Sequence, residues 1–251
     1  MKYATSESNR FKLNVYRDII DQGDIEVDKI HNEIIDNSID LLILRVNSNL
    51  KHLHHQLNKL PYQVLHCDNL VYYKCDLFKN DISDIANQLK FVSFTSEHKP
   101  ILKTIVPEIF KDYQNHYFSN PLLDKKNIID GYIEWVISNS LTERFNDKLW
   151  IVYNSTNQVV GFAKCNYNEY ESICEGVLFG VLPTFSNMGI YTDLIRYSKK
   201  FFREKGIQTM IVSTQLNNYS VQRVWTKENF LISHSYDTYH INTLTKAINN
   251  F

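Results

Sequence analysis

Residues 181–202 read VLPTFSNMGIYTDLIRYSKKFF. An apolar run ends at Pro183, a short polar turn follows, and Gly189 stands directly before a stretch with helical periodicity. The apolar stripe of that stretch consists of Ile190, Leu194, Tyr197 and Phe201. The pattern predicts a strand, a loop and a helix in immediate succession, which is the repeating unit of α/β sheets.

The loop before this helix has the features of an anion site. The first turn of a helix carries backbone N–H groups without partners and a partial positive charge, so phosphate groups bind there readily. Gly189 would let a phosphate approach the backbone with no Cβ in the way. The residues expected to bind a pyrophosphate are Asn187, Met188, Gly189, Ile190 and Tyr191. A glycine at a helix start is also compatible with an ordinary turn, so the loop alone leaves both interpretations open.

The composition sets bounds on the class of protein. The chain has 251 residues, of which 43% are hydrophobic, enough for one large domain or two small ones with buried cores. The 27 Lys and Arg residues nearly balance the 28 Asp and Glu residues, which disfavours nucleic acid and anionic membranes as partners. The start of the chain does not resemble a signal peptide, and no apolar run approaches about 18 residues. We therefore expect a soluble, cytoplasmic protein.

The cysteines do not form a recognisable metal or disulfide pattern. Cys67, Cys75, Cys165 and Cys174 include no CxxC pair and have no histidine at zinc-ligand spacing. We expect four free thiols packed as small apolar side chains, without a disulfide and without a bound metal.

Turn-forming and polar stretches divide the chain into alternating elements. A polar passage before Lys90 suggests two domains, residues 1–90 and residues 91–251. Strands are expected at 12–20, 40–46, 91–95, 173–183, 209–214 and 231–241, with a hairpin or long bent strand at 63–77 and a hairpin at 149–169 that turns at Asn154–Asn157. Helices are expected at 27–37, 50–60, 96–110 with a cap at Ser96, in the stretch from Pro121 to 140, after Gly189, and at 220–230.

Two distant segments show similar patterns. Laying residues 34–66 on residues 202–234 without a gap matches Ile43 with Ile211, Lys59 with Lys227 and His66 with His234. This similarity is either coincidence between two strand–helix–strand segments or the trace of a duplication. In the same register Asp21 falls opposite Gly189, so the first copy would lack the loop, and we expect a single active site in the second domain.

The order of elements resembles the GNAT N-acetyltransferase superfamily. A hairpin, a long strand ending in VLP, a loop with Gly189, a helix, a strand, Asn218, a helix ending in KENF and a final strand follow one another. This resemblance implies an α/β fold with a mixed sheet, the GNAT acyl-CoA N-acyltransferase fold, preceded by a partial GNAT-like domain. Two positions depart from the family loop: Ser186 stands where Gln or Arg is usual, and Tyr191 replaces the last small residue.

A second segment narrows the resemblance. STQLNNYSVQRVWTKENF, residues 213–230, is similar to a segment of sugar-nucleotide acetyltransferases, nearest to the dTDP-fucosamine (dTDP-4-amino-4,6-dideoxygalactose) acetyltransferase type. The stretch HYFSNPLLDKKNIIDGYIEWV, residues 116–136, looks like that group too. The resemblance covers the second domain at the level of motifs and the first at the level of architecture.

The resemblance implies roles for residues around the loop. Acetyl transfer to an amine requires an oxyanion stabiliser, and the family supplies it by backbone N–H groups of the long strand, here near Gly180 and Val181. Asn187 to Tyr191 would bind the pyrophosphate of acetyl-CoA. Asn218 matches the asparagine that contacts the pantetheine arm, although an ordinary helix N-cap is the alternative. Trp225 would pack against the pantetheine or the sugar, or simply within the core.

The sequence identifies the catalytic acid and base less clearly than the cofactor loop. Glu175 stands in an otherwise apolar strand, at the distance ahead of Gly189 that the base has in some family members, and could deprotonate the acceptor ammonium. An exposed glutamate at a strand start is the alternative. Many family members carry their proton donor where this chain has Trp225, whose indole N–H is not an acid at neutral pH. Either water or a ligand amine protonates the departing thiolate, or another phenol replaces the missing one, and Tyr219 and Tyr191 are the candidates.

The acceptor would be bound ahead of the following helix. His116, Tyr117 and Asn120 are polar residues where the family's substrate loop lies, and structural roles are the alternative for each. His52, His54 and His55 have no carboxylate or cysteine at ligand spacing, so we interpret them as a solvated helix face without a metal.

The sequence thus predicts an N-acetyltransferase that uses acetyl-CoA. The expected acceptor is the amino group of a nucleotide-linked sugar, a dTDP-4-amino-4,6-dideoxyhexose used in surface polysaccharide synthesis. Direct transfer through a ternary complex is expected, on the interpretation that neither the loop nor the cofactor strand supplies a cysteine to carry an acyl group. The alternatives are acetylation of a protein N-terminus or a small metabolite amine, and a non-catalytic CoA-binding module. Pairing of the final strand in a homodimer is left open.

Overall fold

The computed structural model describes residues 1–138 and 145–243, which form two compact units. Unit 1 contains 1–71, 114–131 and the chain from His234, and unit 2 contains 72–113 and 132–233. Strands β4 (Gln63–Asp76) and β10 (Leu231–Asn242) and helix α4 (Lys125–Ile137) each have residues in both units. None of the described helices is long and apolar enough to cross a membrane.

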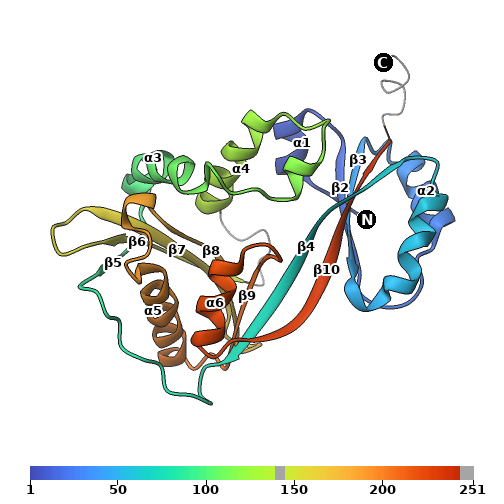
Figure 1. Ribbon diagram of the computed structural model, residues 1–251. Helices are drawn as coiled ribbons and strands as arrows, with labels where there is room; N and C mark the ends of the chain where they lie inside the picture. Colours follow the sequence, from blue (N-terminus) through green and yellow to red (C-terminus); the bar gives the residue numbers. More distant parts are fainter. Residues whose placement is uncertain (139–144, 244–251) are drawn as a thin grey trace. The chain divides into compact units, whose positions relative to one another are not determined.

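Unit 2 contains a mixed sheet in the order β4-β9-β8-β7-β6-β5 (Figure 1). Its strands are β5 (Lys90–Ser93), β6 (Asn146–Tyr153), β7 (Val159–Asn168), β8 (Ile173–Val181) and β9 (Thr209–Gln215). Its helices are the 3₁₀ helices η2 (Ser96–His98) and η4 (Pro183–Phe185), and α3 (Lys99–Phe110), α5 (Ile190–Glu204) and α6 (Tyr219–Lys227). β5 to β8 pair antiparallel, whereas β8 and β9 run parallel.

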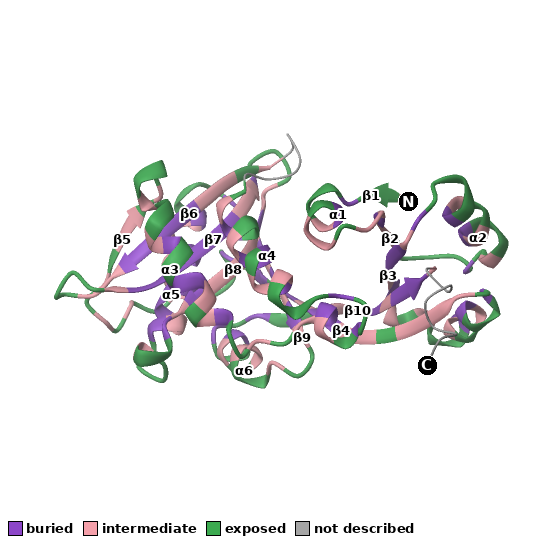
Figure 2. Ribbon diagram, turned by 90° about the horizontal axis from the view of Figure 1, so that it is seen from above, coloured by how far each residue is buried: buried purple, intermediate pink, exposed green. Residues whose placement is uncertain are grey.

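Helices cover both faces of the sheet in unit 2. Ile151 and Phe162 pack with Leu102 of α3, whereas Val152 packs with Ile190 and Leu194 of α5. Because successive strand residues point to opposite faces, this alternation accounts for the apolar runs of β6 and β7, which are mostly buried (Figure 2). The sheet thus holds α5 and its preceding loop against one defined face.

Unit 1 contains strands in the order β1-β2-β3-β10-β4. Its elements are β1 (Lys2–Tyr3), α1 (Thr5–Phe11), β2 (Val15–Ile20), α2 (Val27–Asp36), β3 (Leu41–Asn47), and the 3₁₀ helices η1 (Ser48–Lys59) and η3 (His116–Ser119). One face packs on α2 and η1, and the other packs on residues from Tyr117 to Ile128. β10 pairs antiparallel with β3, and β2 pairs parallel with β3.

The ungapped alignment of the two similar segments also aligns their elements. It places Leu41, the first residue of β3, on Thr209, the first of β9, and Gln63, the first of β4, on Leu231, the first of β10. β10 is the strand beside β3, whereas β4 is the strand beside β9. Each half of the chain therefore supplies the strand that continues the sheet of the other half, as expected for a duplication whose final strands have exchanged places.

Several local expectations need correction. The stretch from Pro121 does not start as a helix: α4 begins at Lys125, after the Asp124 carboxylate accepts the Lys126 N–H (2.9 Å), and residues 139–140 lie outside the described chain. The cap expected at Ser96 is Thr95, whose N–H donates to His98 Nδ1 (3.0 Å). η1 is 3₁₀ rather than α-helical, and β4 is one long strand without a hairpin.

The single domain boundary near Lys90 does not coincide with any junction between the compact units. The units are discontinuous because β4 and β10 contribute residues to both. The division into residues 1–90 and residues 91–251 as separate GNAT-like domains stays a prediction.

Candidate active site

Strands β8 and β9 pair over only part of their lengths. The pairs run from Ile173 opposite Thr209 to Gly176 opposite Val212. β8 continues to Val181 and β9 to Gln215, and within these described strands no mutual pairing is seen beyond that point. The strands diverge there, so the β9-facing backbone groups in the second half of β8 have no strand partner.

A β-bulge marks the point of divergence. Lys164 of β7 pairs with Leu178, whereas the next residue, Cys165, pairs with Gly176, so Val177 is an extra residue on β8. A bulge bends its strand and increases the local twist. The bulge therefore accounts for the separation of β8 from β9.

The hydrogen bond at the end of β8 shows which side of the strand each backbone N–H group faces. The Leu182 N–H donates to Val160 O on β7 (2.9 Å). N–H groups alternate along a strand, so the Gly180 N–H also faces β7, and the Phe179 and Val181 N–H groups face the opposite side, toward β9. Of the two residues predicted to stabilise the oxyanion, Val181 has its donor on the diverging side.

Gly180 is required for packing. A Cβ built on Gly180 would lie 2.9 Å from Ile109 Cγ2 and 2.9 Å from Phe162 Cε1, closer than real Cβ contacts. The glycine thus lets α3 approach β8 closely. Its predicted contact with the cofactor stays a prediction.

The loop ends in a helix N-terminus without a side-chain cap. Gly189 is the N-cap of α5 with φ 76° and ψ 0°, a left-handed conformation that glycine adopts without strain. The first bond within the helix is from the Asp193 N–H to Gly189 O (3.1 Å). The N–H groups of Ile190 to Thr192 precede it and have no helical acceptor. Asn187 is also left-handed (φ 63°), and Met188 is 56% exposed.

A buried carboxylate fixes the outer side of this helix start. Asp193, which is fully buried, accepts the Ala86 N–H (2.8 Å), the Asn87 N–H (3.0 Å) and the Asn87 side-chain amide (2.8 Å). The same Asn87 amide donates to Met188 O (3.0 Å). The extended segment before β5 thereby holds the loop in place.

The end of β9 is tied to the chain after α3. The Tyr113 hydroxyl donates to the Gln215 side-chain oxygen and lies 3.2 Å from Thr214 Oγ1. Asn218, the N-cap residue of α6, donates its amide to Thr214 Oγ1 (2.9 Å). Sequence reasoning missed Tyr113, because its partners lie about a hundred residues away and no local pattern marks it.

Aromatic residues of α5 and α6 differ in their surroundings. Trp225 is 3% exposed and packs edge-on against Tyr73 (5.5 Å between ring centroids), and no hydrogen-bond partner is found for its buried indole N–H among the described residues. Burial raises the pKa of Tyr191, and the Trp225 N–H lowers it in part. Tyr219, by contrast, is 61% exposed.

Residues 106–230, which include the bulged strand, the loop and α5, match the acetyltransferase (GNAT) family. The chain contains a GNAT acetyltransferase domain. It is therefore an acyltransferase, and the GNAT family uses acetyl-CoA as co-substrate. No curated protein sequence matches the chain.

Solved structures support the fold of the GNAT chain. A functionally unknown conserved protein from Staphylococcus epidermidis superposes with a TM-score of 0.60 at 14% identity, covering 96% of this chain and 88% of that one. A GCN5-related N-acetyltransferase from Kribbella flavida gives 0.57 at 9% identity, covering 90% and 81%. A tandem GNAT protein from the clavulanic acid biosynthesis pathway gives 0.57 at 8% identity, covering 85% and 67%. At these identities the similarity concerns the fold alone. One of these similar structures is a tandem GNAT protein.

Glu175 lies one residue before the end of the β8/β9 ladder, opposite Asn166 and Ile211. It is partly buried and close to the diverging strands. This position is compatible with the predicted base, and the assignment stays a prediction. Its neighbour Cys174 also lies on β8, so the premise that the cofactor strand supplies no cysteine is wrong. It is fully buried, and burial raises the pKa of its thiol well above the usual value, so it does not supply a thiolate nucleophile.

The residues predicted to bind the acceptor lie in unit 1. His116, Tyr117 and Asn120 are 6%, 8% and 2% exposed. His116 Nδ1 lies 2.7 Å from His240 Nε2, and the Asn120 amide donates to His240 Nδ1 (3.0 Å). The Tyr117 hydroxyl donates to Glu7 (3.0 Å). These contacts give each residue a structural partner, and their role in binding an acceptor stays a prediction.

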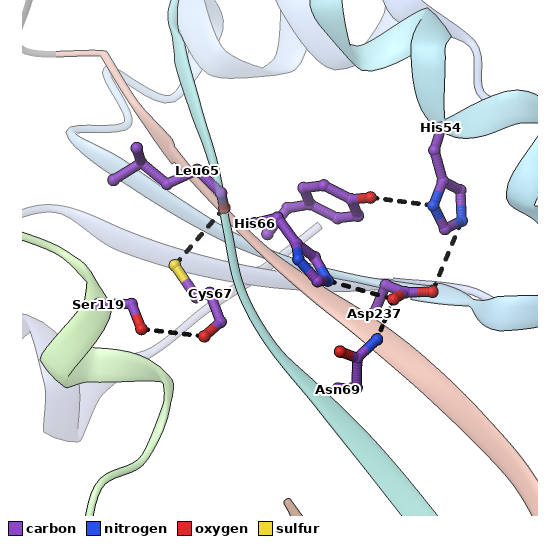
Figure 3. A network of polar contacts seen from close by, with 8 residues as sticks. His54, Leu65, His66, Cys67, Asn69, Ser119 and Asp237 are labelled. Atoms are coloured by element: carbon purple, nitrogen blue, oxygen red, sulfur yellow. Dashed lines mark hydrogen bonds and ion pairs between the residues drawn. The ribbon is translucent and has the colours of Figure 1, made fainter. Parts of the chain in front are cut away.

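Unit 1 contains a second polar cluster, on β4, β10 and η1 (Figure 3). Asp237, 6% exposed, accepts hydrogen bonds from Asn69 and from His66 Nε2 (3.1 Å) and lies 3.9 Å from His54 Nε2. His54 Nδ1 is 2.9 Å from the Tyr239 hydroxyl. The interpretation of His54 as part of a solvated face is therefore wrong, because the ring turns inward to the buried carboxylate. Among the described residues no group suited to a metal ion is found.

Proposed function

We propose that the chain is an acetyl-CoA-dependent N-acetyltransferase that acetylates the amino group of a nucleotide-linked amino sugar, a dTDP-4-amino-4,6-dideoxyhexose, by direct transfer. The observation that supports it most is the divergence of β8 from β9 next to the uncapped start of α5. This arrangement offers unpaired strand N–H groups to a pantetheine arm and helix N–H groups to a pyrophosphate.

The residues at the helix start fit a pyrophosphate. Gly189 has no neighbour within 4 Å of a built Cβ except the Asn87 amide, at 3.7 Å. Its left-handed backbone directs the following N–H groups outward, and a Cβ there would add strain. Asn187, Met188, Ile190 and Tyr191 complete the site that we propose for the phosphates.

The reaction that we propose uses groups on β8. The neutral amine attacks the thioester carbonyl carbon, the C–S bond breaks, the amine loses a proton and the thiolate takes one. The Val181 N–H, on the side facing β9, would donate to the oxyanion. Glu175 would accept the amine proton directly or through one water.

The acceptor class rests on residues 213–230. This segment, similar to that of sugar-nucleotide acetyltransferases, folds into the end of β9, the turn with Asn218 and α6, next to the diverging strands. Asn218 is held there by Thr214 and would contact the pantetheine arm. Amines of protein N-termini or small metabolites remain the competing acceptors.

The first test is a calorimetric titration with acetyl-CoA followed by thiol release with a panel of acceptors. The panel contains several dTDP-4-amino-4,6-dideoxyhexoses, peptides with free N-termini and small primary amines. Binding together with turnover of one sugar nucleotide is expected. Turnover of only peptides or small amines would overturn the acceptor class, and absence of acetyl-CoA binding would overturn the cofactor site.

A further inference from the structure

The end of β9 carries a chain of hydrogen bonds that leads to Asn218. The Asn218 side-chain amide donates to Thr214 Oγ1 (2.9 Å), which lies 3.2 Å from the Tyr113 hydroxyl oxygen. The Tyr113 hydroxyl in turn donates to the Gln215 side-chain oxygen. Thr214 is 5% exposed, whereas Asn218 is only partly buried, so the chain runs from the packed interior to a residue that a ligand can reach.

This chain of hydrogen bonds has a single direction. A hydroxyl has one hydrogen, and Tyr113 uses its hydrogen at the Gln215 oxygen, which can only accept. Because either oxygen of the Tyr113–Thr214 pair could donate, the Thr214 hydroxyl is the donor of that pair. Thr214 Oγ1 then has no hydrogen left for Asn218, so it can only accept, and the Asn218 amide turns its nitrogen toward Thr214.

Among the described residues, no other contact of Asn218 decides the orientation of its amide. Ser220 Oγ donates to Asn218 Oδ1 (3.2 Å), but the same hydroxyl could accept from the amide nitrogen if the amide were reversed. The backbone N–H of Asn218 donates to Gln215 O (3.0 Å), and its backbone carbonyl accepts the Gln222 N–H (3.3 Å). The direction set at Tyr113 therefore determines which amide atom is turned away from β9.

The observed orientation leaves an acceptor at Asn218. Oδ1 keeps a second lone pair besides the one that Ser220 uses. A pantetheine arm contains amide groups with N–H donors, so an Oδ1 that faces the arm can accept from one of them. A reversed amide would instead present its own N–H groups to that N–H group, and the hydrogen bond would be lost.

We propose that Tyr113 is a positioning residue for the acyl donor. Through Thr214 it turns the Asn218 amide so that Oδ1 accepts an N–H of the pantetheine arm. The proposal rests on the proposed function, because it takes Asn218 as a residue that contacts this arm. Tyr113 acts through Thr214 and needs no contact of its own with acetyl-CoA.

The test compares acetyl-CoA with adenosine 3′-phosphate 5′-diphosphate, which has the same nucleotide and lacks the pantetheine arm. Tyr113→Phe keeps the ring and removes the hydroxyl, so Thr214 becomes free to donate to a reversed Asn218 amide. Calorimetry should give an acetyl-CoA affinity about 5-fold lower, the loss of one hydrogen bond, and an unchanged affinity for the nucleotide. Tyr197→Phe, which removes a hydroxyl from α5, is the control and should leave both affinities unchanged.

A double-mutant cycle separates this role from a general loosening of unit 2. In an Asn218→Ala background, Tyr113→Phe should cause no further loss of acetyl-CoA affinity, because no amide is left to orient. Three results would each overturn the proposal: a wild-type acetyl-CoA affinity of Tyr113→Phe, an equal loss of affinity for the nucleotide, and a loss that persists in the Asn218→Ala background.

A second readout needs no ligand. The hydrogens of the Asn218 side-chain amide give a pair of proton–nitrogen correlation signals in NMR spectra, assigned by their absence in Asn218→Asp. In the free wild type the hydrogen donated to Thr214 should exchange with solvent more slowly than the other hydrogen, and Tyr113→Phe should remove this difference. Equal exchange in the wild type, or a difference that Tyr113→Phe leaves intact, would overturn the proposal even if acetyl-CoA binds.

This readout also distinguishes failure of the inference from failure of the proposed function. If the wild type shows the exchange difference but does not bind acetyl-CoA, the proposed function and the pantetheine contact are overturned together, while the orientation of the Asn218 amide by Tyr113 stands.

Discussion

Glu175 is the last carboxylate on β8 before this strand diverges from β9. Glu175→Gln keeps the shape and removes the base, so turnover should fall about 100-fold or more, most strongly at low pH, where the acceptor amine is protonated. The measurement is thiol release across a pH series. Glu169→Gln, in an exposed ion pair with Lys205 (3.4 Å), is the control and should behave as wild type. Full activity of Glu175→Gln at every pH would remove Glu175 as the base.

Gly189 and Gly206 share a backbone conformation at opposite ends of α5, with φ 76° and 77°. Gly189→Asp should weaken acetyl-CoA binding at least about 10-fold, because a carboxylate would face the pyrophosphate. Gly206→Asp introduces the same strain and charge with no atom within 4 Å of the new Cβ, and its affinity should stay unchanged. Calorimetry on both variants checks this. Equal acetyl-CoA affinities of the two variants would show that the phosphates do not bind at Gly189.

At the scale of elements, the start of α5 depends on the segment that precedes β5. Asp193→Ala removes the acceptor of two backbone N–H groups and one side-chain amide. Bonds to a charged group contribute about 1.5–3 kcal/mol, so the free energy of unfolding should fall by that order. Asp84→Asn breaks a surface ion pair with Lys200 (2.5 Å) and should lower the free energy of unfolding much less, because exposed ion pairs contribute little to stability. Denaturant unfolding of the two variants compares them, and equal losses would contradict the anchoring role of Asp193.

The packing of η3 on β10 predicts a pH dependence of stability. Burial, with a smaller contribution from Arg17, lowers the pKa of His240 to about 3 from its ordinary 6.5, and burial lowers that of His116 well below the same value. The unfolded chain therefore binds more protons between these pH values, so stability is full above about pH 6.5 and is lost as the pH falls. The loss should approach about 1.4 kcal/mol per pH unit for each histidine.

Denaturant unfolding at several pH values below 7 measures this slope. His240→Gln should reduce the slope relative to wild type, whereas His55→Gln, at an exposed position of η1, should not change it. A wild-type stability that does not fall between pH 6.5 and pH 5 would contradict the assignment of a neutral buried pair.

At the scale of the whole molecule, the two halves share elements but differ where acetyl-CoA would bind. β2 and β3 stay paired over the full length of β2, from Val15 to Ile20, so these strands do not diverge. The alignment also puts Asp21 where unit 2 has Gly189. Calorimetry should therefore give one acetyl-CoA per chain, and a stoichiometry of two would show that unit 1 binds it as well.

Local signals predicted much of the fold correctly. Turn residues placed the hairpin at Asn154–Asn157, where the Asn154 N–H donates to Gln158 O (2.9 Å), and periodicity placed α5 and α6. The predictions were wrong where a short-range signal competes with tertiary packing. Pro121 can start a helix in isolation, but Asp124 caps the observed one. His54 looks solvated in the sequence until the strands beside it are known.

The sequence by itself determined the order of elements and the loop with its glycine, because backbone conformation and hydrophobic periodicity depend on neighbouring residues. The exchange of β4 and β10, the divergence of β8 from β9, the packing of Trp225 on Tyr73 and the buried pair of His116 and His240 were decided only by the tertiary structure. These features join residues far apart in the chain. Strand pairing and burial are set by the whole set of packed elements, and no local pattern encodes which strand lies beside which.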